Sequence, residues 1–230
     1  MSHYHVCIDP GHGPGCANKS PDGSYEEQEF AMDLANRIAA LLRSHGVQVT
    51  LTRSAQDYPS LRSRCQTANA IPNLALFVSI HSNAAGNHGW YQASGHMVFT
   101  SQEGKTAKRN QAAGSILKQW KDAKIPLRGN GLVHYGYTVL TGTVAPAILL
   151  EHGFHTNQEE VTLLKNEAYR DYLAEADCKG ILTFLGLPWK WEANHRERVK
   201  QRFGLQDMTL DYLQAYRYAD DLLRKLALRE

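Results

Sequence analysis

The sequence of 230 residues predicts an α/β protein with a mostly parallel, twisted sheet flanked by helices and a small C-terminal helical segment. Strand-like and helix-like segments alternate along residues 1–187, which is typical of parallel strands joined by crossover helices. Two apolar runs, at residues 74–80 and 146–150, are continuous instead of alternating, as expected of strands covered on both faces. In such sheets the functional residues lie at the carboxyl ends of the strands.

The expected strands are short runs that end at glycine, proline or polar residues. The first strand ends at Pro10 and Gly11, and a loop rich in Gly, Pro, Asn and Ser follows at residues 11–24. A second, Gly-rich loop is expected at residues 128–137. In chain order, the expected strands cover residues 5–9, 47–51, 74–80, 95–99 and 146–150.

Helices are expected where apolar residues recur every three or four positions. In residues 26–45, Phe30, Leu34 and Ile38 keep this spacing, and Gly46 ends the helix. The other helices of the first domain are expected at residues 60–70, 105–124, 159–165 and 168–185.

The composition changes after Trp189, so we expect two domains, residues 1–187 and residues 190–230. The second is expected to form helices at residues 194–202 and 209–228. A segment of 41 residues (190–230) buries too little core to fold alone, so it packs on the first domain or pairs with a second copy. The apolar face of the last helix would consist of Leu210, Leu213, Tyr216, Tyr218, Leu222, Leu223 and Leu226.

The composition argues against several classes of partner. Lys and Arg number 25 against 23 Asp and Glu, a net charge of +2 that gives no reason to expect nucleic acid binding. No apolar run reaches the roughly 18 residues that span a bilayer, so we expect no membrane insertion. The four cysteines have no CxxC spacing and are expected to be reduced thiols.

Three polar residues come at or just after the ends of expected strands. His12 follows the first strand, His81 follows the run at residues 74–80, and Glu151 follows the run at residues 146–150. A single histidine in such a place is more often structural than functional. Three such residues at the ends of three strands indicate a functional site, because burying each of them without a partner would be costly.

Four motifs occur in a distinctive order. They are DPGHG at residues 9–13, an acidic residue at the start of the first helix, VSIHSNA at residues 78–84 and PAILLEHGFHTN at residues 146–157. Together they resemble the zinc-dependent N-acetylmuramoyl-L-alanine amidases, which are peptidoglycan-cleaving catalytic domains of cell-wall hydrolases and phage endolysins. The resemblance runs from about residue 5 to residue 187, and the blocks 49–53, 61–64 and 68–69 also look like those of the family.

The resemblance implies a zinc ion held by His12, Glu27 and His81, with the fourth position open for water. It also implies that Glu151 is the catalytic acid and base beside the metal. Three acids crowd the start of the first helix. The family pattern places its acid three residues before the first apolar position of that helix, and this selects Glu27 because Phe30 is that position.

Substrate contacts are expected around this centre. In the loop at residues 83–94, Asn83 lies at the site edge, and Trp90 either stacks on a sugar ring or anchors the loop to the core. His134, in the expected loop at residues 128–137, could line the groove. His152 and its neighbour His155 are expected behind the ligands or facing the substrate.

The leading functional hypothesis is hydrolysis of the amide bond between N-acetylmuramic acid and L-alanine, in the manner of a phage-type endolysin. The chain shows no signal peptide, so we expect a cytoplasmic protein that acts on the wall after release. One alternative is a zinc peptidase or deacylase acting on another amide. The other is a non-catalytic wall-binding module, against which the four intact site residues argue. Residues 190–230 would target the wall or form a homodimer, and DNA binding is least favoured.

Overall fold

The structure, a computed structural model, describes residues 4–86, 89–101, 107–189, 199–200 and 203–214. The chain divides into two compact units, Met1–Pro188 and Trp189–Glu230. None of the helices in the described residues is long and apolar enough to cross a membrane.

The first unit is built on a six-stranded sheet with the strand order β2-β1-β3-β6-β4-β5. The strands β2, β1, β3 and β6 are parallel to one another, while β4 and β5 run parallel to each other and antiparallel to β6. The predicted mostly parallel α/β sheet is thus confirmed. The strands are β1 (His5–Pro10), β2 (Gln48–Leu51), β3 (Leu76–Asn83), β4 (His96–Thr100), β5 (Leu127–His134) and β6 (Ala147–Phe154).

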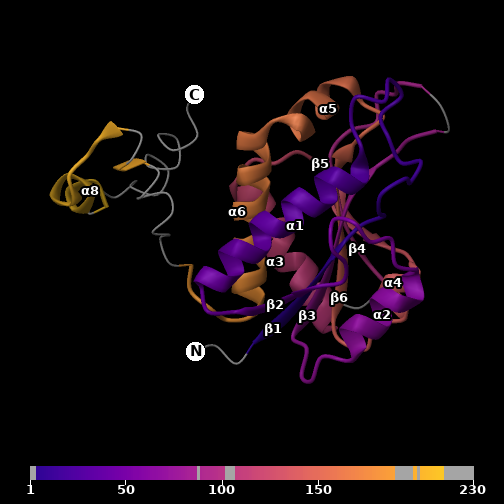
Figure 1. The fold of residues 1–230 in the computed structure, drawn as a ribbon, viewed down its shortest axis with the longest axis horizontal. Helices are drawn as coiled ribbons and strands as arrows, with labels where there is room; N and C mark the ends of the chain where they lie inside the picture. The colour runs from indigo at the N-terminus through magenta and orange to yellow at the C-terminus, as the bar shows by residue number, and fades with distance from the viewer. Residues whose placement is uncertain (1–3, 87–88, 102–106, 190–198, 201–202, 215–230) are drawn as a thin grey trace. The chain divides into compact units, whose positions relative to one another are not determined.

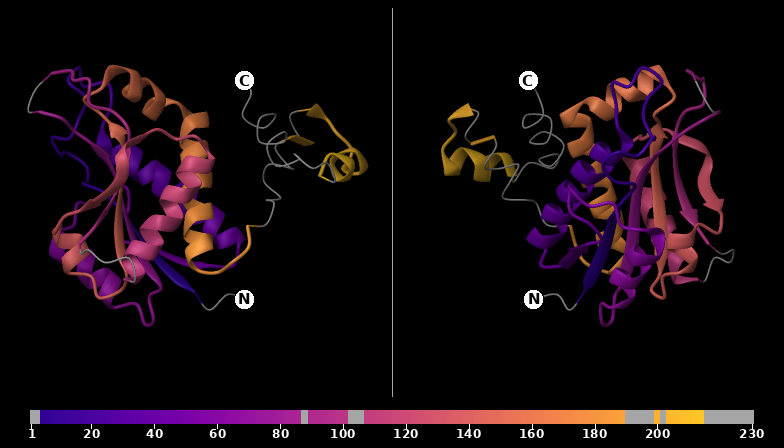
Figure 2. Two further views of the ribbon diagram at one scale, coloured as in Figure 1. Left: turned by 180° about the vertical axis from the view of Figure 1, so that it is seen from behind. Right: turned by 45° about the vertical axis from the view of Figure 1, so that its right-hand side comes forward.

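Helices cover both faces of the sheet (Figure 1). On one face α6 packs against both α1 and α3, and on the other face α2 packs against α4. Figure 2 shows the same layers from behind and after a turn of 45° about the vertical axis. The helices are α1 (Glu27–Ser44), α2 (Leu61–Asn69), α3 (Lys108–Asp122), α4 (Thr138–Thr141), α5 (Gln158–Lys165) and α6 (Glu167–Phe184).

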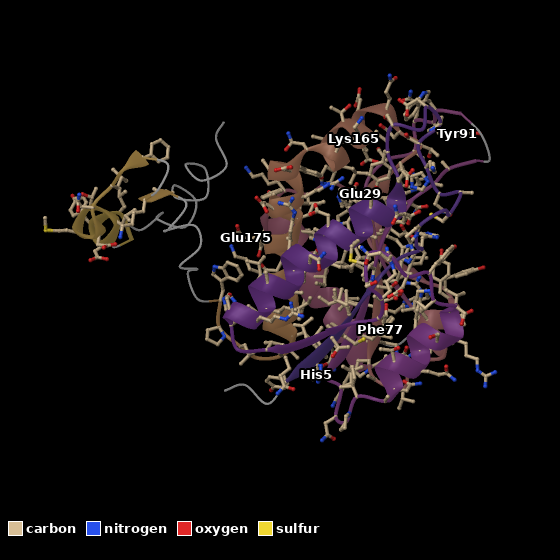
Figure 3. All side chains as sticks on the ribbon, in the orientation of Figure 1. His5, Glu29, Phe77, Tyr91, Lys165 and Glu175 are labelled. Carbon is tan, nitrogen blue, oxygen red and sulfur yellow. The ribbon has the colours of Figure 1, made fainter. Side chains whose placement is uncertain are left out.

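The central strands are buried on both faces, which explains their continuous apolar runs. Phe77 of β3, labelled in Figure 3, belongs to the core between the sheet and the α2–α4 layer. Phe30 and Ile38 of α1 and Trp120 of α3 are fully buried in the opposite helical layer. Helix packing on both faces holds the carboxyl-terminal ends of the central strands in place, and the candidate residues lie there.

Three expected elements differ in the structure. The strands β3 and β6 run on through His81 and Glu151, so these residues lie inside strands and not after them. The prediction of a loop at residues 128–137 is wrong, because most of this segment forms the edge strand β5. Gly129 and Gly131 have φ angles of 61° and 81°, and the pairing with β4 shifts register, which hides the alternation of a regular strand.

The second unit contains α8 (Asp207–Gln214). This helix covers the start of the one expected at residues 209–228, and residues 215–230 lie outside the described residues. The helix expected at residues 194–202 also lies largely outside them. Leu210 of α8 is buried, whereas Tyr212 is 81% exposed.

Candidate metal centre and active site

Four predicted residues line one cavity at the carboxyl ends of the central strands. His12 follows β1, His81 lies near the end of β3, and Glu151 lies opposite His81 in the register of β6. Glu27 reaches the same place from the first turn of α1. All four line a cavity of about 1020 Å³. The sheet order β1-β3-β6 brings these residues together although they are far apart in the sequence.

The turn after β1 is shaped by close contact with His81. A Cβ atom on Gly11 would lie 2.4 Å from Cε1 of the His81 ring, so only glycine leaves room for that ring. The Gly11 amide donates a hydrogen bond of 2.9 Å to the carbonyl of Ile80, which ties the turn to β3. His12 then adopts a φ of 55°, a left-handed conformation.

The two histidines face opposite oxygens of one carboxylate. Nε2 of His12 lies 3.2 Å from Oε2 of Glu27, and Nδ1 of His81 lies 2.9 Å from Oε1. The possible ligand atoms of the three residues all lie within 4.8 Å of one another. Around a four-coordinate zinc ion with bonds of about 2.0–2.1 Å, neighbouring donors lie about 3.3 Å apart. This donor set therefore fits a zinc ion.

The neighbouring acids have other partners. Glu26 precedes α1 and lies 2.7 Å from Nζ of Lys19. Glu29, labelled in Figure 3, accepts hydrogen bonds of 2.9 and 3.0 Å from the Arg170 guanidinium. Of the three acids at the start of α1, the structure brings Glu27 to the histidines.

Glu27 is held as a carboxylate. It is 2% exposed, and its Oε1 accepts a hydrogen bond of 3.0 Å from the Ser82 amide. Burial alone would raise the pKa of Glu27, but hydrogen bonds to His12 and His81 and the charges of both rings outweigh it and hold the pKa well below its ordinary value. An ionised carboxylate is the form that binds a metal ion.

Glu151 has the opposite environment. Its side chain is buried, and its Oε2 atom has no hydrogen-bond partner among the residues that the structure describes. Burial, and secondarily the charge of Glu27, raise the pKa of Glu151 well above its ordinary value. A buried carboxyl with a raised pKa, at the wall of a cavity, suits proton transfer at neutral pH.

A buried network behind Glu27 was not predicted as such. The Tyr25 hydroxyl donates a hydrogen bond of 2.7 Å to Oγ of Ser82, and Nδ1 of His155 lies 3.0 Å from the same Oγ. Nδ1 of His155 also lies 3.8 Å from Oε2 of Glu27. The Tyr25 and His155 rings stack with their centroids 6.0 Å apart. His155 is therefore a buried neighbour of the ligand Glu27, as one of the two expectations had it, and it also belongs to the lining of the cavity.

Two buried arginines fix the loop that carries His12. Arg64 of α2 forms an ion pair of 2.8 Å with Asp9 and donates to the carbonyls of Pro10 and His12. Arg53 donates to the carbonyls of Pro10 and Gly11, at 2.9 and 3.0 Å. The sequence blocks that contain these arginines thus position the metal-binding loop.

The expected substrate contacts have different placements. Asn83 lines the cavity, while Trp90 and His134 do not, so a substrate contact by those two stays a prediction.

His152 is fully buried, which contradicts the expectation that it faces the substrate. Neighbouring residues of a strand point to opposite faces, so His152 points away from the face that Glu151 occupies. Its Nε2 atom lies 3.2 Å from Oδ2 of Asp177 in α6, without hydrogen-bond geometry.

Three tyrosines of the cavity wall were not predicted from the sequence. Tyr58, Tyr135 and Tyr137 all line the cavity. Tyr135 and Tyr137 follow the unrecognised strand β5, and Tyr58 precedes α2, so no local pattern links the three.

An α/β fold with two histidines and a glutamate beside a buried carboxyl is typical of a metallohydrolase. The N-acetylmuramoyl-L-alanine amidase family profile matches residues 6–183, and the chain belongs to this family. This finding confirms the resemblance that the four sequence motifs indicated.

Individual relatives agree with this assignment. The chain is 30% identical over 187 residues to an endolysin of Bacillus phage SPP1, covering 80% of this chain and 67% of the endolysin. It is 28% identical over 178 residues to the probable cell wall amidase LytH of Staphylococcus aureus, covering 76% of this chain and 56% of LytH. The chain thus spans about two thirds of the length of the endolysin and just over half of the length of LytH.

A solved structure shows the same fold. The N-acetylmuramoyl-L-alanine amidase from Clostridium difficile 630 superposes with a TM-score of 0.72 at 31% identity. The match covers 80% of this chain and 97% of that one.

Proposed function

We propose that the chain is a zinc-dependent N-acetylmuramoyl-L-alanine amidase, which hydrolyses the amide bond between N-acetylmuramic acid and L-alanine in peptidoglycan. The observation that carries this proposal is the His12–Glu27–His81 cluster, which shares one cavity with Glu151 in a member of this family. The donor spacing, the ionised Glu27 and the raised pKa of Glu151 support it.

His12, Glu27 and His81 would hold the zinc ion. When bound, zinc polarises a carbonyl oxygen and lowers the pKa of a water molecule. Glu27 contributes the negative charge, and the turn at Gly11 sets the His12 ring at an angle of 82° to the His81 ring.

Glu151 moves the proton. As the water oxygen bonds to the amide carbon, a Glu151 carboxylate oxygen takes one proton from that water. The carbon–nitrogen bond then breaks, and Glu151 passes the same proton to the leaving nitrogen of L-alanine. The products are the free lactyl carboxylic acid and a free amine, and Glu151 returns to its starting state. The buried Oε2 of Glu151 is suited to this task because no other group of the described residues competes for its proton.

Within this function we propose a phage-type endolysin that acts on the wall after its release. The phage SPP1 endolysin, the first of the relatives described above, favours this role. A resident wall hydrolase remains the alternative, favoured by the similarity to LytH.

The test is digestion of purified peptidoglycan with and without a chelator, followed by labelling of the new amino termini. We expect L-alanine to be the only new amino terminus and chelation to abolish its release. Another new terminal residue would favour a different zinc peptidase, and wall binding without any release would favour a non-catalytic module.

A further inference from the structure

Three tyrosines lie on the wall of the catalytic cavity. Tyr58 is 58% exposed and Tyr135 is 59% exposed, and both line the cavity. Large aromatic rings that remain in contact with water at the edge of a cavity are a common feature of ligand-binding sites. We call Tyr58, Tyr135 and Tyr137 the tyrosine rim.

Tyr58 is fixed beside the metal-binding loop. A Cβ atom on Gly13 would lie 2.6 Å from Cβ and Cγ of Tyr58, so the base of this side chain packs directly on the Gly13 backbone. Gly13 follows His12 in the sequence. The exposed part of the Tyr58 ring therefore borders the place where His12 lies.

The other two tyrosines lie near Glu151. The rings of Tyr135 and Tyr137 have centroids 4.6 Å apart, and Tyr137 packs edge-on against Phe99, at 5.4 Å. Phe99 pairs with Leu149 of β6, the strand that carries Glu151, and both Tyr137 and Glu151 line the cavity. The tyrosine rim and His81 thus line the same cavity.

The charged side chains of the cavity do not favour recognition of the carboxylates of the peptide stem. Arg64 is the only Lys or Arg among the described residues that line it, and this side chain is 2% exposed. Its guanidinium is already engaged by Asp9 and by backbone carbonyls. Glu27 and Glu151 add negative charge. Apart from the proposed zinc ion, a carboxylate of a peptide stem would meet no free Lys or Arg side chain among the described residues of this wall.

Resting on the proposed amidase function, we propose that the tyrosine rim binds the sugar ring of the substrate. The chain then selects its substrate by the sugar and not by the carboxylates of the peptide. A sugar is uncharged and has apolar C–H faces that stack on aromatic rings, while its hydroxyls bond to tyrosine hydroxyls and water.

The test compares binding of two soluble ligands to the zinc-loaded Glu151→Gln variant by NMR titration. One ligand is N-acetylmuramoyl-L-alanyl-D-isoglutamine, and the other is D-lactoyl-L-alanyl-D-isoglutamine, which has the same amide and no sugar. We expect the sugar-bearing ligand to bind at least about tenfold more tightly. Adding Tyr58→Ala or Tyr135→Ala should remove most of this difference, whereas Tyr135→Phe should keep it.

Tyr212→Ala is the matched control, because this tyrosine is exposed on α8 and does not line the cavity. Replacing D-isoglutamine with D-glutamate, which adds a carboxylate, should not tighten binding. Equal affinity for the two ligands, equal weakening of both by Tyr135→Ala, or tighter binding of the D-glutamate form would each overturn the inference. Hydrolysis by the unmodified chain is scored separately: sugar-selective binding without hydrolysis would overturn the amidase proposal and still support the tyrosine rim.

Discussion

Glu27 and Glu151 are carboxyl groups in one cavity, and their surroundings push their pKa values in opposite directions. Glu27 lies 3.2 Å from Nε2 of His12 and 2.9 Å from Nδ1 of His81 and accepts a hydrogen bond from the Ser82 amide, so its pKa is held below the ordinary value. Glu151 is also buried but has an oxygen without a hydrogen-bond partner among the described residues, and its pKa is raised. Divergent pKa values in a shared site separate a metal ligand from a proton-transfer group.

The first prediction concerns Glu151. Glu151→Gln keeps the shape of the side chain and removes the proton acceptor, so turnover should fall by roughly 10²-fold or more while zinc is retained. Metal analysis and hydrolysis rates on the same preparation check this outcome. Near-normal turnover would show that Glu151 is not the proton-transfer group, and loss of zinc would make it a ligand.

The second prediction concerns the network behind Glu27. His155→Ala removes the ring that lies 3.8 Å from Glu27 and bonds to Ser82, so zinc affinity should fall by about 10–100-fold. The control is His134→Ala, because His134 also bonds to a hydroxyl, that of Thr100, but lies outside the cavity lining. Competitive chelator titration measures both. Identical zinc affinity in the two variants would reduce the network to a structural role.

At the scale of elements, the parallel strands were predictable because a strand covered on both faces has a continuous apolar run. The convergence of His12, His81 and Glu151 followed from the same topology. The strand β5 was not predictable, because its two glycines in the left-handed region disturb the strand pattern.

Side-chain contacts between residues far apart in the sequence could not be predicted either. Tyr25 and Ser82 are 57 positions apart, and Ser82 and His155 are 73 positions apart. The pairing of β3 with β6 brings Ser82 and His155 together, and the segment before α1 adds Tyr25. His152 illustrates a different error: the alternation along β6 sends it to the opposite face from Glu151.

The third prediction tests how α2 holds the loop of His12. Arg64→Ala leaves Asp9 as a buried charge without its cation, so the free energy of unfolding should fall by about 3–5 kcal/mol. Arg62→Ala, an exposed position on the same helix, should change it by less than about 0.5 kcal/mol. Denaturant unfolding of both variants checks the difference, and equal effects would show that the ion pair does not anchor α2.

At the scale of the whole molecule, every residue of the proposed site lies in the first unit, Met1–Pro188. The family match also ends within this unit, at residue 183. We propose that residues 190–230 form a small domain that targets the wall or forms a homodimer.

The fourth prediction concerns removal of residues 190–230. The shortened chain should stay folded and bind zinc, because the sheet and the ligand set lie upstream. It should cleave small soluble muropeptides as fast as the full chain but clear whole cells more slowly. Equal clearing would rule out a targeting role. Light scattering on both forms tests dimerisation, which predicts a change from dimer to monomer.

The most direct test of the central claim is the metal content of the purified chain, measured together with its activity. His12, Glu27 and His81 predict about one equivalent of zinc per chain. His12→Ala and His81→Ala should each lose the metal and the hydrolysis of peptidoglycan together, in protein that remains folded. Full activity of the metal-free chain, or of either variant without zinc, would contradict the zinc mechanism.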